Sequence, residues 1–85
     1  MILEPSKEVI ESVLINLDYY DLSFLNYDTY SKIFWYDGYL DTNYRIKVIV
    51  NETKLEIWDC IYTENNYVRA GVAKFKQGVW EVKYE

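Results

Sequence analysis

Residues 44–50, YRIKVIV, alternate between two sets of side chains with a period of two. One set is Tyr44, Ile46, Val48 and Val50, and the other is Arg45, Lys47 and Ile49. Such alternation predicts a β-strand with one face toward a core. This stretch decides the fold class, because the residues that follow it repeat the same pattern.

Three further segments are predicted strands: 54–63 (KLEIWDCIYT), 67–76 (YVRAGVAKFK) and 79–85 (VWEVKYE). In the last one, Trp80, Val82 and Tyr84 share a face. Polar turn sequences separate the segments at Asn51-Glu52-Thr53, Glu64-Asn65-Asn66 and Gln77-Gly78. Strands joined by such short turns are expected to form an antiparallel meander.

Residues 6–17, SKEVIESVLINL, follow a helical period instead. Apolar residues form two adjacent rows, one of Val9, Val13 and Leu17 and the other of Ile10 and Leu14. Polar residues lie opposite, so the segment is predicted to be an amphipathic helix. Its start is marked either by Pro5 as the first helical residue or by Ser6 as the N-cap.

The predicted fold class is α+β: a single domain over residues 1–85, with the N-terminal helix packed on a four- to five-stranded antiparallel meander in two layers. In outline, one helix wrapped by antiparallel strands resembles the cystatin and NTF2-like architectures. Folds of this kind carry many functions, so the outline alone implies none of them.

Residues 18–43 keep neither period. Asp28 is placed to cap a short helix, whereas residues 32–36 (KIFWY) are rich in strand formers and lead into the turn dipeptide Asp37-Gly38. We favour a strand at 31–36 that returns through 41–43. Upstream of it, the interpretation of 18–30 (DYYDLSFLNYDTY) is that the apolar residues face inward, namely Leu22, Phe24 and Leu25.

The residue types restrict the available chemistry. The chain has no histidine and one cysteine, which excludes imidazole bases, Ser-His or Cys-His pairs and the usual zinc ligands. Cys60 is expected to be a small buried hydrophobe, and Trp35, Trp58 and Trp80 are expected in the core. One cysteine, no signal-like start and no long apolar run indicate a cytoplasmic protein without a membrane segment.

Paired carboxylates are the remaining acid and base groups, at Asp18 and Asp21 and at Asp37 and Asp41. Neither pair has the spacing of a calcium loop. Carboxylates in loops ordinarily serve turns and solvation, so we expect no enzyme activity, no metal and no cofactor.

Charge is split along the chain. Residues 1–44 hold eight acidic and two basic side chains, a net charge of −6, whereas 45–85 hold six acidic and seven basic, +1. The bases are too few and too balanced to displace the counterions of nucleic acid, so direct nucleic-acid binding is not expected. The acidic half instead favours a basic protein partner.

Tyrosines within a residue or two of aspartates suit a binding face, since tyrosine buries a large ring at low entropic cost while its hydroxyl remains available for hydrogen bonds. The alternative is that many of these tyrosines pack the core and the acids only maintain solubility. The predicted partner-binding residues are Asp18, Tyr19, Tyr20, Asp21, Tyr27, Asp28, Tyr30, Tyr36, Asp37, Tyr39 and Asp41.

The function these features favour is inhibition of a basic, nucleic-acid-processing protein by a non-enzymatic acidic binder, as in phage-encoded anti-CRISPR or anti-restriction proteins that mimic DNA. An immunity protein or antitoxin that neutralises a toxin would use the same surface. A third hypothesis is a small-ligand binder with a cavity between helix and sheet, lined by the three tryptophans. A homodimer through an exposed strand edge is compatible with all three.

Overall fold

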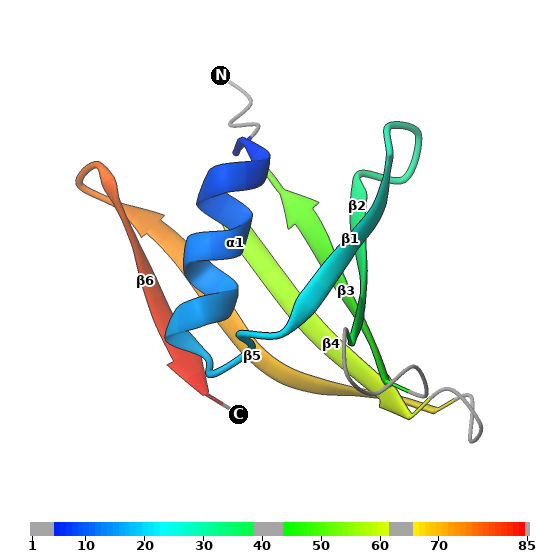
Figure 1. Cartoon of the computed structure of the whole chain (residues 1–85). Helices are drawn as coiled ribbons and strands as arrows, with labels where there is room; N and C mark the ends of the chain where they lie inside the picture. Colours follow the sequence, from blue (N-terminus) through cyan, green and yellow to red (C-terminus); the bar gives the residue numbers. More distant parts are fainter. Residues whose placement is uncertain (1–4, 39–43, 62–65, 85) are drawn as a thin grey trace.

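The structure of the chain, a computed structural model, describes residues 5–38, 44–61 and 66–84. One N-terminal helix precedes a six-stranded antiparallel meander, so the α+β class is confirmed. The elements are α1 (Lys7–Asn16), β1 (Leu22–Asp28), β2 (Ile33–Gly38), β3 (Tyr44–Asn51), β4 (Lys54–Ile61), β5 (Asn66–Lys76) and β6 (Val79–Tyr84). Figure 1 shows the sheet curving so that its two edge strands, β1 and β6, flank the helix.

Each strand pairs with its neighbour in the sequence, in the order β1-β2-β3-β4-β5-β6. The predicted count of four to five strands was too low because β1 was not recognised. The strand predicted at 31–36 is β2, displaced by about two residues. The predicted turn at Gln77-Gly78 is confirmed, and both of its residues have positive φ, 50° and 83°, as a tight hairpin turn requires.

The helix begins as the N-cap alternative predicted, with the Ser6 hydroxyl accepting a hydrogen bond from the Val9 amide at 3.3 Å. Its apolar rows supply four buried side chains, Ile10, Val13, Leu14 and Leu17. The helix backbone contacts β6 only weakly, so its burial comes from these side chains. Across the described parts of the chain, no helix is long and apolar enough to cross a membrane.

The core lies on the side of the sheet that faces α1, and this side we call the inner face. It takes alternate residues from the strands, as the period of two predicted: Phe34 and Tyr36 of β2, Ile46, Val48 and Val50 of β3, Leu55 and Ile57 of β4, and Ala73 of β5. Gly71 brings the helix end and β6 together. A Cβ there would lie 2.7 Å from the Lys83 carbonyl oxygen and 3.2 Å from Leu17 Cδ2.

The prediction that Leu25 faces inward was wrong, since this side chain is 43% exposed. Leu22 packs against the core, and Phe24 is 38% exposed but meets the buried rings of Phe34 and Tyr36 at centroid distances of 6.5 and 5.5 Å, so both face inward as predicted. The register of β1 against β2 shifts between Phe24 and Asn26, so Leu25 is the extra residue of a β-bulge. A bulge interrupts the alternation of a strand, which explains why the apolar side chain of Leu25 reaches the surface.

The tryptophans also differ from one another. Trp80 packs against the core, as predicted. Trp35 and Trp58 alternate with the buried residues of their strands, so they lie half-buried on the outer face of the sheet, away from α1.

Candidate functional site

The connection from α1 to β1 begins with a Schellman turn. The Asp18 amide donates to the Ile15 carbonyl at 3.0 Å and the Tyr19 amide donates to the Leu14 carbonyl at 2.9 Å. Asp18 has φ of 67°, a left-handed conformation usually left to glycine and tolerated by aspartate better than by most residues. This backbone places a carboxylate at the end of the helix.

Two tyrosine hydroxyls converge on that carboxylate. Tyr20 donates to Asp18 Oδ1 at 3.1 Å, and the Tyr84 hydroxyl lies 3.3 Å from Oδ2. The Tyr84 hydroxyl also lies 2.9 Å from the Asn16 carbonyl oxygen. The end of β6 is therefore tied to the end of α1 by polar contacts.

A second carboxylate is held on the inner face of β4. Asp59 Oδ2 accepts from the Tyr19 hydroxyl at 2.6 Å and from the Tyr44 hydroxyl at 3.1 Å, in a part-buried environment. Burial raises the pKa of Tyr44 to about 12, and burial together with the bond to Asp59 raises that of Tyr19 further. Both phenols therefore remain neutral donors at physiological pH.

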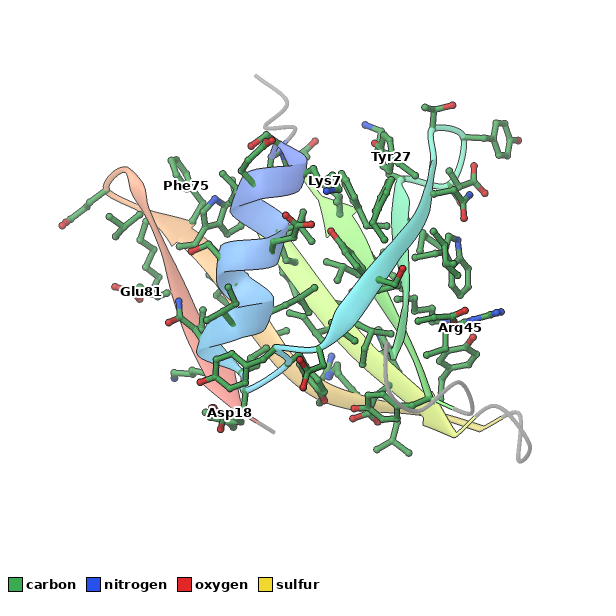
Figure 2. All side chains as sticks on the ribbon, in the orientation of Figure 1. Lys7, Asp18, Tyr27, Arg45, Phe75 and Glu81 are labelled. Atoms are coloured by element: carbon green, nitrogen blue, oxygen red, sulfur yellow. The ribbon has the colours of Figure 1, made fainter. Side chains whose placement is uncertain are left out.

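We call these groups the tyrosine–aspartate cluster: Asp18, Tyr19, Tyr20, Asp21, Tyr44, Asp59 and Tyr84. Several of them surround an open pocket of about 260 Å³, and its described lining contains no lysine or arginine. Figure 2 shows Asp18 at the end of the helix opposite to Lys7. The pocket thus offers aromatic walls, hydroxyls and negative charge without a nearby cation in its lining.

The structure brings together four of the residues predicted for partner binding, namely Asp18, Tyr19, Tyr20 and Asp21. Asp28 ends β1 and Tyr30 follows in the next turn, so both lie at the far end of the strand, about 20 Å away at the rise of a strand. Asp28 closes a turn there by accepting from the amides of Tyr30 and Ser31, and hydrogen bonds from Ser31 lower its pKa.

The other predicted residues have different positions. Tyr36 is 1% exposed in the core, and Tyr27 stacks on Phe34 with ring centroids 4.2 Å apart. Asp37 pairs with Arg45 at 2.9 Å. Tyr39 and Asp41 lie outside the described residues.

Three members of the cluster were not predicted: Tyr44, Asp59 and Tyr84. Asp59 had a usable signal, because it follows Leu55 and Ile57 on the inward-facing positions of its strand. A carboxylate at an inward position needs hydrogen-bond donors. Which donors reach it depends on strand register and on the path of the 18–21 connection.

A contrasting group lies on the outer face, and we call it the outer-face cluster: Trp35, Lys47, Trp58, Tyr67 and Arg69. The Lys47 Nζ is 4.3 Å from the ring centroid of Tyr67, and the Arg69 Cζ is 5.9 Å from that of Trp58. Trp35 meets Tyr67 edge to face at 6.3 Å. Since Trp35 and Trp58 lie here and Trp80 on the inner face, the three tryptophans do not line one cavity.

Among the residues that the structure describes, no group of three histidine, cysteine, aspartate or glutamate side chains is placed to hold a metal ion. Comparison of the chain with protein-family models, with curated proteins and with solved structures finds no significant match. The functional argument therefore rests on the tyrosine–aspartate cluster.

Proposed function

We propose that the chain is a small acidic, non-enzymatic protein that inhibits a basic nucleic-acid-processing protein in the cytoplasm, as a phage-encoded anti-CRISPR or anti-restriction inhibitor does. One observation carries the proposal. Two carboxylates and three tyrosines of the tyrosine–aspartate cluster line a pocket whose described lining is free of lysine and arginine, and Asp59 and Tyr84 hold these residues from outside the lining.

Such a surface suits a cleft that normally holds nucleic acid. Its carboxylates would take the place of phosphates opposite lysine and arginine, and its rings would take the place of bases. A formal net charge of −5 on 85 residues adds long-range attraction to a basic partner. Tyrosine is also the residue type expected to contribute strongly to binding at the centre of an interface.

The hydrogen bonds within the cluster support this role by fixing side chains in advance. Tyr19 and Tyr44 are held by Asp59, and Tyr20 is held by Asp18. Side chains that are already ordered lose less entropy when a partner binds. Asp21 is exposed and belongs to the same pocket, so its charge is available at the surface.

The test is inhibition of cleavage by a panel of purified RNA-guided nucleases and restriction endonucleases, combined with calorimetry at low salt. We expect inhibition of at least one enzyme, weakened by added salt because the attraction is electrostatic. The Asp18→Lys/Asp21→Lys variant should lose inhibition while keeping the far-ultraviolet circular dichroism of the wild type.

The matched control is Glu52→Lys/Glu81→Lys, which makes the same change in net charge at exposed positions outside the pocket lining. It should retain most of the inhibition. Equal loss in both variants would reduce the effect to net charge alone. No heat and no change in cleavage across the panel would contradict the proposal.

A further inference from the structure

A second pocket, between α1 and the start of β1, has a volume of about 170 Å³. We call it the helix–β1 pocket. Its lining includes Glu11, Leu14 and Ile15 from the helix, Tyr20 and Leu22 from the connection, and Tyr36 from β2. It shares Tyr19, Tyr20 and Leu22 with the first pocket, so the two pockets adjoin one another at this short segment.

One lining residue, Tyr36, carries a buried hydroxyl without a partner. Tyr36 is 1% exposed, and its Oη is buried and makes no hydrogen bond. Buried polar groups are nearly always satisfied, so an exception calls for an explanation. Burial and the charges of Glu11 and Glu8 raise the pKa of Tyr36, so the phenol stays neutral and lies toward the helix that carries these two acids.

The surrounding groups define what the pocket can accept. Glu11 is 40% exposed and pairs with Lys7 at 2.9 Å, an exposed pair on one helix that a second cation can join or replace. The carboxylate disfavours an anionic ligand. The rest of the lining is apolar or aromatic: Leu14, Ile15, Tyr19, Tyr20 and Leu22.

An arginine side chain fits these requirements. Its guanidinium is planar, offers five donors and packs against aromatic rings, and its methylene stem suits an apolar wall. The pocket volume equals about five or six waters at about 30 Å³ each, which is the scale of one long side chain.

We propose that the helix–β1 pocket binds an arginine side chain of the partner, with the guanidinium paired to the Glu11 carboxylate and, once the side chains that cover Tyr36 shift, donating to the Tyr36 hydroxyl. This inference rests on the proposed function, since a basic partner supplies the arginine. It gives a role to the unpaired Tyr36 hydroxyl, which is not part of the tyrosine–aspartate cluster.

The test uses N-acetyl-arginine methylamide as the probe and the neutral citrulline analogue as its control, each titrated into the isotope-labelled full chain by NMR. With arginine we expect saturable chemical-shift changes at residues 11–22 and 36. With citrulline we expect binding at least about tenfold weaker, because the loss of one charge-assisted hydrogen bond costs about that factor. Lys7→Gln should tighten arginine binding by removing the competing ammonium.

Two variants identify the contacts. Tyr36→Phe deletes only the hydroxyl and should weaken arginine binding about fivefold while raising the melting temperature, because an unpaired buried group is removed. Glu11→Gln should weaken binding about tenfold. Glu81→Gln is the matched control: this acid pairs with Lys76 at 3.8 Å, away from the pocket, and its loss should leave binding unchanged.

Equal affinity for arginine and citrulline, or arginine affinity unaffected by Tyr36→Phe and Glu11→Gln, would overturn the inference and leave a pocket that holds solvent. The two proposals fail separately. If a nuclease is inhibited through Asp18 and Asp21 but the arginine probe does not bind, only the pocket assignment falls. If the probe binds but no nuclease is inhibited, the proposed function falls and with it the partner as the source of the arginine.

Discussion

Tyrosine has different roles in the two polar aromatic regions of this molecule. In the tyrosine–aspartate cluster the hydroxyl is used, as when Tyr19 and Tyr44 both donate to Asp59. In the outer-face cluster the ring is used, since Lys47 lies over the face of Tyr67 at 4.3 Å. The first region orders carboxylates, and the second covers cations with aromatic surface.

The two regions also differ in how far their charges are compensated by neighbouring groups. The Arg69 guanidinium contacts both Glu56, at 3.4 Å, and the ring of Trp58. Its charge is thus partly compensated within the outer-face cluster. The Asp18 and Asp59 carboxylates of the tyrosine–aspartate cluster are met by neutral hydroxyls, which orient a negative charge without neutralising it.

The largest expected loss of stability comes from removing the Asp59 carboxylate in the tyrosine–aspartate cluster. Asp59→Ala removes the acceptor of two part-buried hydroxyls, and we expect it to lower the free energy of unfolding by about 2–3 kcal/mol. Urea denaturation at pH 7 measures this. Asp59→Asn keeps an acceptor and should cost less than half as much. Equal losses in the two variants would show that charge, and not the hydrogen bonds, matters there.

The second prediction concerns the unfolding free energy at alkaline pH. The pKa of Tyr44 is raised to about 12 and those of Tyr19 and Tyr36 are raised as well, so the folded chain keeps protons that the unfolded chain releases near pH 10. Stability is therefore full below pH 10 and falls as pH rises toward 12, by up to about 1.4 kcal/mol per pH unit for each such tyrosine.

The measurement for this second prediction is the difference in unfolding free energy between wild type and Tyr44→Phe from pH 8 to 11.5. Taking the difference removes the contribution of lysines that titrate in the same range. The phenylalanine variant should show a shallower decline above pH 10. Parallel curves for the two proteins would mean that Tyr44 does not hold its proton on folding.

The smallest effect belongs to the outer face. Lys47→Met keeps an unbranched stem and removes the charge over Trp58 and Tyr67, and we expect a loss of about 0.5–1 kcal/mol. Lys74→Met, at an exposed position on β5, is the control and should change stability by less. If the two variants behave alike, the rings do not stabilise the ammonium, and the contrast between the regions loses one side.

The helix and β3 to β6 could be predicted because each buries one face, which leaves a regular period in the sequence. β1 could not, since it is a bulged edge strand with exposed residues on both sides of Leu25. A strand without a consistently buried face leaves no period to detect. The short helix that Asp28 was considered to cap does not form: its carboxylate accepts from the amides of Tyr30 and Ser31 and closes a turn before β2.

The candidate site could be predicted only where its residues are close together in the sequence. Asp18 to Asp21 are adjacent in sequence, and their composition alone indicated a binding surface. Asp59 and Tyr84 join them only after β4 and β6 take their places in the sheet. The exposure of Tyr36 was misjudged, because the adjacent Asp37 suggested a surface position whereas the strand position of Tyr36 faces the core.

The contact between Tyr84 and the end of α1 has a consequence for biosynthesis. Every strand pairs with its neighbour along the chain, so hairpins can form successively as residues leave the ribosome. The helix is made first, yet its polar partner on β6 emerges after all five other strands. We therefore expect ribosome-bound chains that stop after β5 to hold most of the sheet but to lack the Tyr84 contacts at the end of α1. The proposed binding surface would then be finished only when translation has passed β6.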